Sequence, residues 1–230
     1  MIQTNVKGNN FPNPFQEAAS KICMNRKPKR LTTEDLKTVR GRLLNEWFPE
    51  WGFNPSEIER DELDKLAAWI AAYWKGITDP EYRPRKCLLL CGPTGRGKTM
   101  LAKMLGARFG ITFFTADEVD QLYAEPEKYL AYSAKVIEGK KDIVLDDIGS
   151  EMLRSRYGNH PEFPSVLVRL YESWNYRGKL IIGTTNFSFG RGGYELFVER
   201  YGTRIAERLV EMFMTVGLSG NTNYRWLAHE

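Results

Sequence analysis

Short apolar runs that end in polar residues recur along the chain from residue 86 onward. Runs of about four to eight apolar residues are typical of strands buried on both faces of a parallel sheet. Between them, apolar residues three or four positions apart indicate amphipathic helices. The pattern predicts strands at 86–91, 111–115, 142–149 and 179–186, and helices at 98–109, 117–138 and 164–176. This alternation predicts an α/β fold with a central parallel sheet.

The first 80 residues follow a different pattern, and we expect them to be organised separately. Residues 1–30 are polar and irregular and end in a basic cluster, which predicts a flexible solvated segment. The segment Thr32-Thr33-Glu34-Asp35 is expected to cap a helix that runs to about Trp47, because acidic residues in the first turn suit the helix dipole. A second helix is predicted from about Pro55 to Trp74.

Aromatic residues are concentrated in these two predicted helices and the turn between them. They are interpreted either as the core of a small helical module and its contact with the following domain, or in part as a surface that binds a partner. We predict a partner-binding module at 31–80 and a second domain at 85–230. The aromatic residues are Trp47, Phe48, Trp51, Phe53, Trp69, Tyr73 and Trp74.

A glycine-rich loop connects the first predicted strand of the second domain to its helix. Gly92, Gly95, Gly97, Lys98 and Thr99 fit the pattern G-x-x-x-x-G-K-[ST], which predicts a loop whose backbone amides hold the phosphates of ATP. The lysine is expected to reach the β- and γ-phosphates and the threonine hydroxyl to bind Mg²⁺. The alternative is an ordinary glycine-rich turn before a helix. The residues expected to contact the nucleotide are Gly92, Pro93, Thr94, Gly95, Arg96, Gly97, Lys98, Thr99 and Met100.

Two adjacent carboxylates end the strand predicted at 142–149. Asp146 lies at the carboxyl end of the strand, where ligands of parallel sheets bind, and is expected to hold Mg²⁺ together with Thr99. Asp147 points to the other face of the strand and is expected to polarise the attacking water. Without the phosphate loop, the same pair would be interpreted as a strand that meets a solvated turn.

Two further polar positions are candidates for the same chemistry. Asn186 ends the strand predicted at 179–186 and is expected to orient the attacking water or to sense the γ-phosphate, unless it only caps a turn. Arg204 and Arg208 lie one helical turn apart. They are expected to complete the site of a neighbouring subunit by stabilising transition-state charge, or else to pair with Glu207 or Glu211 on a solvated helix.

Composition and cysteine content narrow the class of protein. The chain is 42% hydrophobic and 27% charged with a net charge of +4, which allows nucleic acid as a partner without requiring it. Three cysteines and two histidines predict neither a disulfide framework nor a zinc site, and leave little prospect of a Ser-His hydrolase. The absence of a transmembrane run or signal peptide predicts a cytoplasmic protein without a membrane partner.

The order of these motifs resembles the AAA+ ATPases of the DnaC and DnaI helicase-loader family and the related IstB transposition helpers. The resemblance covers residues 85–226 and rests on the phosphate loop, Val-Leu-Asp-Asp-Ile-Gly, Gly-Thr-Thr-Asn, Tyr-Gly-Thr-Arg-(x)3-Arg-Leu and a closing strand from Val216 that ends in Tyr224-Arg225. It implies a three-layer α/β core without a C-terminal helical lid. It also implies assembly as a homo-oligomer or on a partner, with an arginine that reaches the neighbouring nucleotide.

The same resemblance implies a function. It suggests an ATPase that binds single-stranded DNA through Ser155, Arg156 and Tyr157 and engages a replicative helicase, although arginine and tyrosine are also ordinary surface-loop residues. In the alternative, the ATPase assists a transposase or another DNA-processing partner. A small-molecule kinase with a P-loop is a third interpretation, against which the Gly-Thr-Thr-Asn and Tyr-Gly-Thr-Arg segments argue.

Overall fold

A computed structural model of the chain describes residues 30–76, 86–124, 139, 141–153, 163–187, 193–220 and 223–224. The chain divides into residues 1–30 and a compact unit at 31–230, which contains nearly all of the described residues. The helices predicted for 31–80 and the predicted ATPase domain therefore belong to one compact unit. A partner-binding role for the helices stays a prediction.

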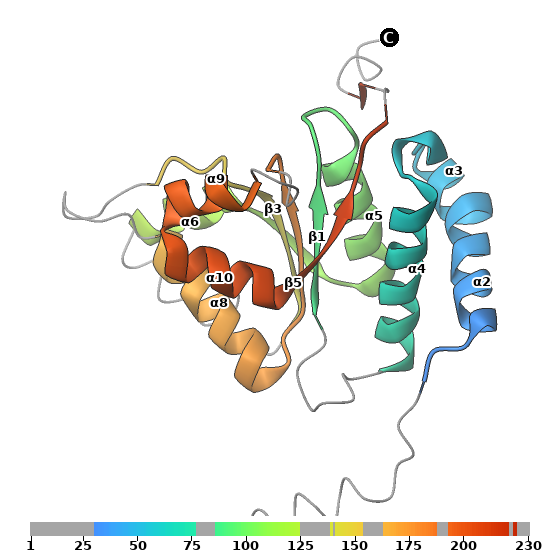
Figure 1. Ribbon diagram of the computed structural model, residues 1–230, viewed down its shortest axis with the longest axis horizontal. Helices are drawn as coiled ribbons and strands as arrows, with labels where there is room; N and C mark the ends of the chain where they lie inside the picture. Colours follow the sequence, from blue (N-terminus) through green and yellow to red (C-terminus); the bar gives the residue numbers. More distant parts are fainter. Residues whose placement is uncertain are drawn as a thin grey trace, which may run out of the picture. The chain divides into compact units, whose positions relative to one another are not determined.

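A five-stranded sheet forms the centre of this unit (Figure 1). All of its strand pairs are parallel, so the carboxyl ends of the strands lie along one edge. Strand β1, which leads into the candidate site, lies between β4 and β5. In spatial order the strands are β2 (Thr112–Thr115), β3 (Ile143–Ile148), β4 (Ile181–Thr185), β1 (Cys87–Cys91) and β5 (Phe213–Gly217).

Helices cover both faces of the sheet, which confirms the predicted three-layer α/β fold (Figure 1). On one face lie α2 (Thr33–Arg42), the π-helix η1 (Leu43–Trp47), α3 (Phe48–Glu50), the 3-10 helix η2 (Pro55–Glu57), α4 (Arg60–Lys75) and α5 (Lys98–Phe109). On the other lie α6 (Ala116–Ala124), α8 (Phe163–Arg177), α9 (Gly193–Tyr201) and α10 (Thr203–Met212).

Alternation along β1 explains how one strand serves both layers. Leu88 and Leu90 pack with the α2–α5 side, whereas Cys87, Leu89 and Cys91 pack with the α6–α10 side. Successive side chains of a strand point to opposite faces, and all five residues are buried. The two cysteines are therefore buried core residues that are thiols and not disulfides.

Several predicted boundaries differ from the observed ones. The helix predicted from Pro55 begins at Arg60, because Asn54 caps a short 3-10 turn and Ile58 is extended. The closing strand predicted from Val216 begins at Phe213, which pairs with Cys87. The cap predicted within 32–35 is confirmed and lies at Thr32, whose hydroxyl accepts from the amide of Asp35. Helix α9 was not predicted. Of the helical segment predicted at 117–138 with a break near Pro126, the first part is observed as α6, and residues 125–138 lie outside the described part of the chain.

Most of the N-terminal aromatic residues pack into the core that α5 shares with the sheet. Trp47, Phe48, Phe53 and Trp69 are buried, and the Trp69 indole donates to the carbonyl of Lys86 at 2.8 Å. Trp74 is 43% exposed. Core packing therefore accounts for most of this aromatic group. No helix within the described residues is both long and apolar enough to cross a membrane.

Candidate nucleotide-binding site

The glycine-rich loop connects β1 to α5 as predicted, and its glycines are required by the backbone. Gly92, Gly95 and Gly97 have positive φ angles of 140°, 84° and 81°. A side chain at Gly92 would place its Cβ 2.2 Å from the carbonyl oxygen of Leu218. Gly97 immediately precedes the first turn of α5, so free backbone amides and the positive end of the helix dipole face the loop. This is the local structure that binds phosphate.

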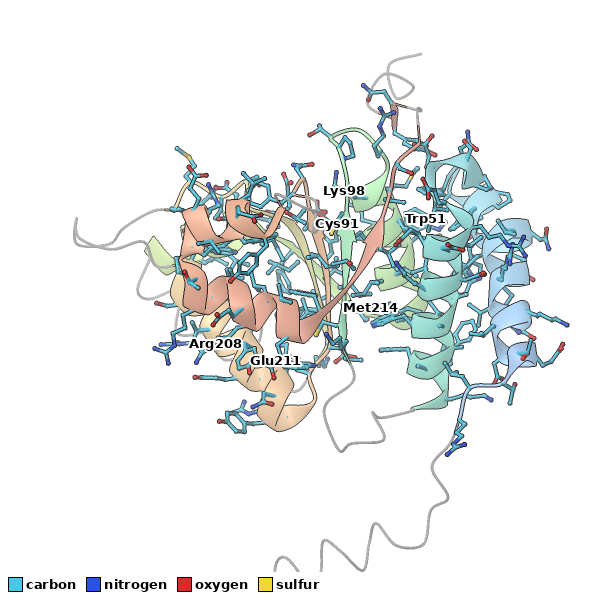
Figure 2. The ribbon with its side chains drawn as sticks, viewed as in Figure 1. Trp51, Cys91, Lys98, Arg208, Glu211 and Met214 are labelled. Carbon is cyan, nitrogen blue, oxygen red and sulfur yellow. The ribbon has the colours of Figure 1, made fainter. Side chains whose placement is uncertain are left out.

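Lys98 lies inside this loop with its side chain largely buried. Its ammonium group donates to the carbonyl of Pro93 at 2.7 Å and to Oδ1 of Asn186 at 2.9 Å. The Thr94 hydroxyl donates to the same Asn186 oxygen at 3.3 Å. Asn186 follows β4, the strand beside β1, so the sheet brings the loop lysine and the predicted sensor residue together. Figure 2 shows Lys98 near Cys91, at the carboxyl end of β1.

Asp146 and Thr99 meet at the end of β3. The Thr99 hydroxyl lies 3.0 and 3.1 Å from the two carboxylate oxygens of Asp146. Thr184 of β4 donates its hydroxyl to Asp146 Oδ1 at 2.6 Å. The predicted metal pair is therefore adjacent, and a neighbouring strand fixes its carboxylate.

Asp147 is held separately from Asp146 by an unusual backbone conformation. Its φ is +62°, which is uncommon for a residue other than glycine. Its amide donates to the Thr184 hydroxyl at 2.8 Å, and its Oδ1 accepts from the Asn186 amide at 2.9 Å. The two carboxylates thus have different partners, which agrees with the different roles predicted for them.

The electrostatics of Asp146 favour a bound cation. Burial raises the pKa of this carboxyl, and the charge of Asp147 raises it further, while hydrogen bonds from Thr184 and Thr99 oppose the shift. A buried carboxylate beside a second one is stabilised by a nearby cation. Mg²⁺ prefers oxygen ligands and is usually held by one or two carboxylates together with substrate phosphates, so the Thr99 and Asp146 oxygens fit it.

Two aromatic rings and an asparagine pack behind the phosphate loop. Phe53 and Tyr224 stack with ring centroids 5.8 Å apart, and a Cβ on Gly97 would lie 2.9 Å from the first ring and 3.0 Å from the second. The amide of Tyr224 donates to the carbonyl of Gly95 at 3.0 Å, and Asn223 lies against the same glycine. Residues near both ends of the described chain therefore support the loop. Met100, predicted to contact nucleotide, is half-buried beside this core.

The two candidate arginines lie on α10, in the layer of α6 to α10. Arg204 is exposed, and the Arg208 guanidinium lies 5.1 Å from the ring centre of Tyr171 on α8. Glu211 accepts from the Tyr171 hydroxyl at 2.7 Å. Figure 2 shows Arg208 and Glu211 together, well apart from Lys98. Neither arginine is part of the cluster formed by the described site residues of its own chain.

The predicted DNA-binding residues are not described by the structure, and one residue of the site, Thr184, was not predicted. Ser155, Arg156 and Tyr157, predicted to bind DNA, lie outside the described residues. Thr184 links the carboxylate of Asp146 to the backbone amide of Asp147 but was not singled out from the sequence. The only signal was its place in the polar end of a buried strand, one that runs beside β3.

A parallel sheet with a phosphate loop after β1 and paired carboxylates on β3 defines a P-loop nucleoside triphosphatase. Residues 88–191 match the family described as "ATPase family associated with various cellular activities (AAA)". This segment therefore resembles an AAA ATPase domain, which confirms the predicted enzyme class, an ATPase, and implies nucleotide binding.

Relatives in sequence are much longer than this chain. Katanin p60 ATPase-containing subunit A1 of Strongylocentrotus purpuratus is 31% identical over 121 residues, which cover 50% of this chain and 23% of the relative. Spastin of Rattus norvegicus is 29% identical over 171 residues, which cover 68% of this chain and 29% of the relative. The chain thus spans about a quarter of the length of these curated relatives.

Solved structures with a similar fold include helicase loaders. The DnaC helicase loader has a TM-score of 0.53 at 22% identity, and the match covers 74% of this chain and 99% of that one. DnaI has a TM-score of 0.50 at 18% identity, with 74% and 92% covered. The predicted resemblance to the loaders is confirmed as a resemblance of fold.

Proposed function

We propose that the chain binds ATP with Mg²⁺ at this site, hydrolyses it, and uses the cycle to load or remodel a replicative helicase on single-stranded DNA. The observation that supports the chemistry best is a continuous set of contacts across three neighbouring strand ends. It joins Lys98 to Asn186, Asn186 to Asp147, and Asp147 through Thr184 to Asp146 and Thr99.

Each residue has a distinct task in this proposal. Lys98 and the loop amides bind the phosphates, and Thr99 and Asp146 are the residues that would hold Mg²⁺. When bound, the metal neutralises phosphate charge. Asp147 accepts a hydrogen bond from the attacking water, and Asn186 orients that water beside the lysine. Water attacks the γ-phosphorus, the bond to the β-phosphate oxygen breaks, and ADP and phosphate leave.

The position of the arginines supports a site shared between subunits. Arg208 projects from α10, away from the Lys98 cluster of its own chain, so it serves the γ-phosphate bound by a neighbour in an oligomer or an assembly on the partner. The loader role rests on the fold shared with DnaC and DnaI. The DNA role rests on Arg156 and Tyr157, whose charge and ring suit a sequence-tolerant grip on a single strand.

The test is steady-state ATPase activity of the wild type, Lys98→Ala and Arg208→Ala, with and without single-stranded DNA and a replicative helicase from the same source. We expect both substitutions to abolish turnover and an equal mixture of the two variants to recover part of it. Recovery requires that one variant supplies the phosphate loop and the other the arginine.

Controls separate the parts of the proposal. Lys98→Ala should lose nucleotide binding, whereas Arg208→Ala should retain it, as measured by equilibrium binding of a fluorescent ATP analogue. Normal turnover by Arg208→Ala would refute the shared site. Turnover that responds to neither DNA nor helicase would refute the loader role and leave an ATPase, for which a transposase partner is the next test.

A further inference from the structure

A buried carboxylate that has no place in the proposed chemistry lies four residues after Asp147. Glu151 is 1% exposed and is fully engaged by three donors. Its Oε2 accepts from the amide of Gly149 at 2.9 Å, and its Oε1 accepts from the Tyr201 hydroxyl at 2.5 Å and from Arg200 Nε at 2.9 Å. Arg200 also donates through Nη2 to the Glu151 carbonyl oxygen.

These contacts join the turn after β3 to α9. Asp147, Gly149 and Glu151 belong to the turn, while Arg200 and Tyr201 form the last residues of α9. The turn is tight, since the Ser150 amide donates to the Asp147 carbonyl at 3.1 Å and the Ser150 hydroxyl to the same oxygen at 2.7 Å. The carboxylate therefore connects a helix to the backbone on which Asp147 stands.

The turn needs such support because it contains a residue other than glycine, Asp147, with a positive φ. Asp147 has φ +62° and Gly149 has φ +103°. A left-handed conformation at a residue other than glycine costs free energy, and persists where the surroundings hold it. Thr184 and Asn186 hold Asp147 from the β4 side, and Glu151 holds the other end of the turn.

We infer that Glu151 is a positioning residue for hydrolysis, which, together with Arg200 and Tyr201, holds the turn that presents Asp147. This inference rests on the proposed ATP hydrolysis. Glu151 lies outside the loop that holds Lys98, so its loss should reduce turnover without reducing nucleotide affinity. Displacing a catalytic carboxylate by about 1 Å from its productive position can lower the rate of the reaction about a hundredfold.

The experiment compares Glu151→Gln with Tyr201→Phe and a matched control, Tyr73→Phe. Glutamine keeps the size but presents an NH₂ group at one of the two oxygen positions, so it loses either the Gly149 bond or those to α9. Tyr201→Phe removes one donor. Tyr73→Phe removes a phenol that donates to Asp142 at 3.1 Å, at the opposite end of β3.

We expect Glu151→Gln to lower kcat about tenfold or more with KM changed less than about threefold, since only an interaction needed for the chemical step is lost. Tyr201→Phe should lower kcat by a smaller factor, and Tyr73→Phe should leave it unchanged. Amide exchange of Gly149, followed by NMR, should be faster in Glu151→Gln than in the wild type.

Two results would overturn the inference: an unchanged kcat in Glu151→Gln, or equal losses in Glu151→Gln and the Tyr73→Phe control. A wild-type protein that binds ATP without hydrolysing it is a different failure, since it refutes the proposed function. In that case the Gly149 exchange decides by itself whether Glu151 holds the turn, and an unchanged exchange rate overturns the inference.

Discussion

Thr184→Val removes one buried hydroxyl that contacts both aspartates of the site, the carboxylate of Asp146 and the backbone amide of Asp147. Thr184 is 1% exposed, donates to Asp146 Oδ1 at 2.6 Å and accepts from the Asp147 amide at 2.8 Å. Valine has nearly the same shape, so it leaves no cavity and removes only these two hydrogen bonds. The substitution therefore isolates their contribution to the free energy of unfolding.

The expected loss in the free energy of unfolding follows from the two groups that lose a hydrogen bond, the Asp146 carboxylate and the Asp147 amide. An unsatisfied buried amide costs about 1–3 kcal/mol, and a hydrogen bond to a carboxylate contributes about 1.5–3 kcal/mol. Asp146 retains the hydroxyl of Thr99, so the lower part of the combined range applies, about 3 kcal/mol. In a chain of this size, that corresponds to a fall in Tm of about 6–12 °C.

Thr184→Ser is the matched control, because it keeps the hydroxyl and loses the methyl group. Removing one buried methyl group costs about 1 kcal/mol. Urea and thermal unfolding of the nucleotide-free protein measure both variants. If Thr184→Val is no more destabilising than Thr184→Ser, the Thr184 hydroxyl does not stabilise the Asp146 carboxylate and the Asp147 amide, and the prediction is wrong.

Three further predictions concern ionisation and strain. Lys179 is 1% exposed, and burial lowers its pKa from 10.5 to about 8. Between pH 8 and pH 10.5 the unfolded chain therefore binds a proton on Lys179 that the folded chain has lost. The free energy of unfolding should rise with pH across this range. Lys179→Met should remove this rise and stabilise the protein at pH 7, as measured by urea unfolding at pH 7 and pH 10. Burial raises the pKa of Asp146 above 3.8, so the folded protein keeps the Asp146 carboxyl protonated to a higher pH than the unfolded chain does. The free energy of unfolding therefore falls as pH rises through the folded pKa. Asp146→Asn should flatten this decline and stabilise the nucleotide-free protein at pH 7, in urea unfolding without Mg²⁺; a lower stability at pH 7 would contradict the prediction. Gly149→Ala should cost about 1–3 kcal/mol, because φ is +103° and the new Cβ would lie 2.8 Å from the Phe187 ring. Phe187→Leu in the same chain should restore part of the lost Tm by relieving the contact.

Local patterns carried most of the information about the fold. The strand that became β1 was predicted because its run of apolar residues ends at a glycine-rich loop, and the buried strand is observed at Cys87–Cys91. Helix α5 was predicted with its observed bounds, Lys98–Phe109, since the loop sets its start and Gly110 ends it. These features depend only on neighbours in sequence.

The parts that were not predicted depend on residues distant in sequence. The role of Thr184 follows from the pairing of β3 with β4, which is irregular between Leu145 and Ile148, and periodicity does not reveal such an irregularity. The Phe53 and Tyr224 stack joins segments about 170 residues apart, as does the bond from the Asn54 amide to the Tyr224 hydroxyl. An aromatic pattern shows that these rings are buried but not which loop they support.

The strand order has a consequence for the way the protein is made. Strand β1 is synthesised well before β4 and β5, its two neighbours in the sheet. The phosphate loop gains the hydrogen bond from the Tyr224 amide to the Gly95 carbonyl only when Tyr224 has been synthesised. Nucleotide therefore cannot assist the early stages of cotranslational folding. Until β4 has been synthesised, neither edge of β1 can form its native pairing, so this apolar strand needs protection from aggregation.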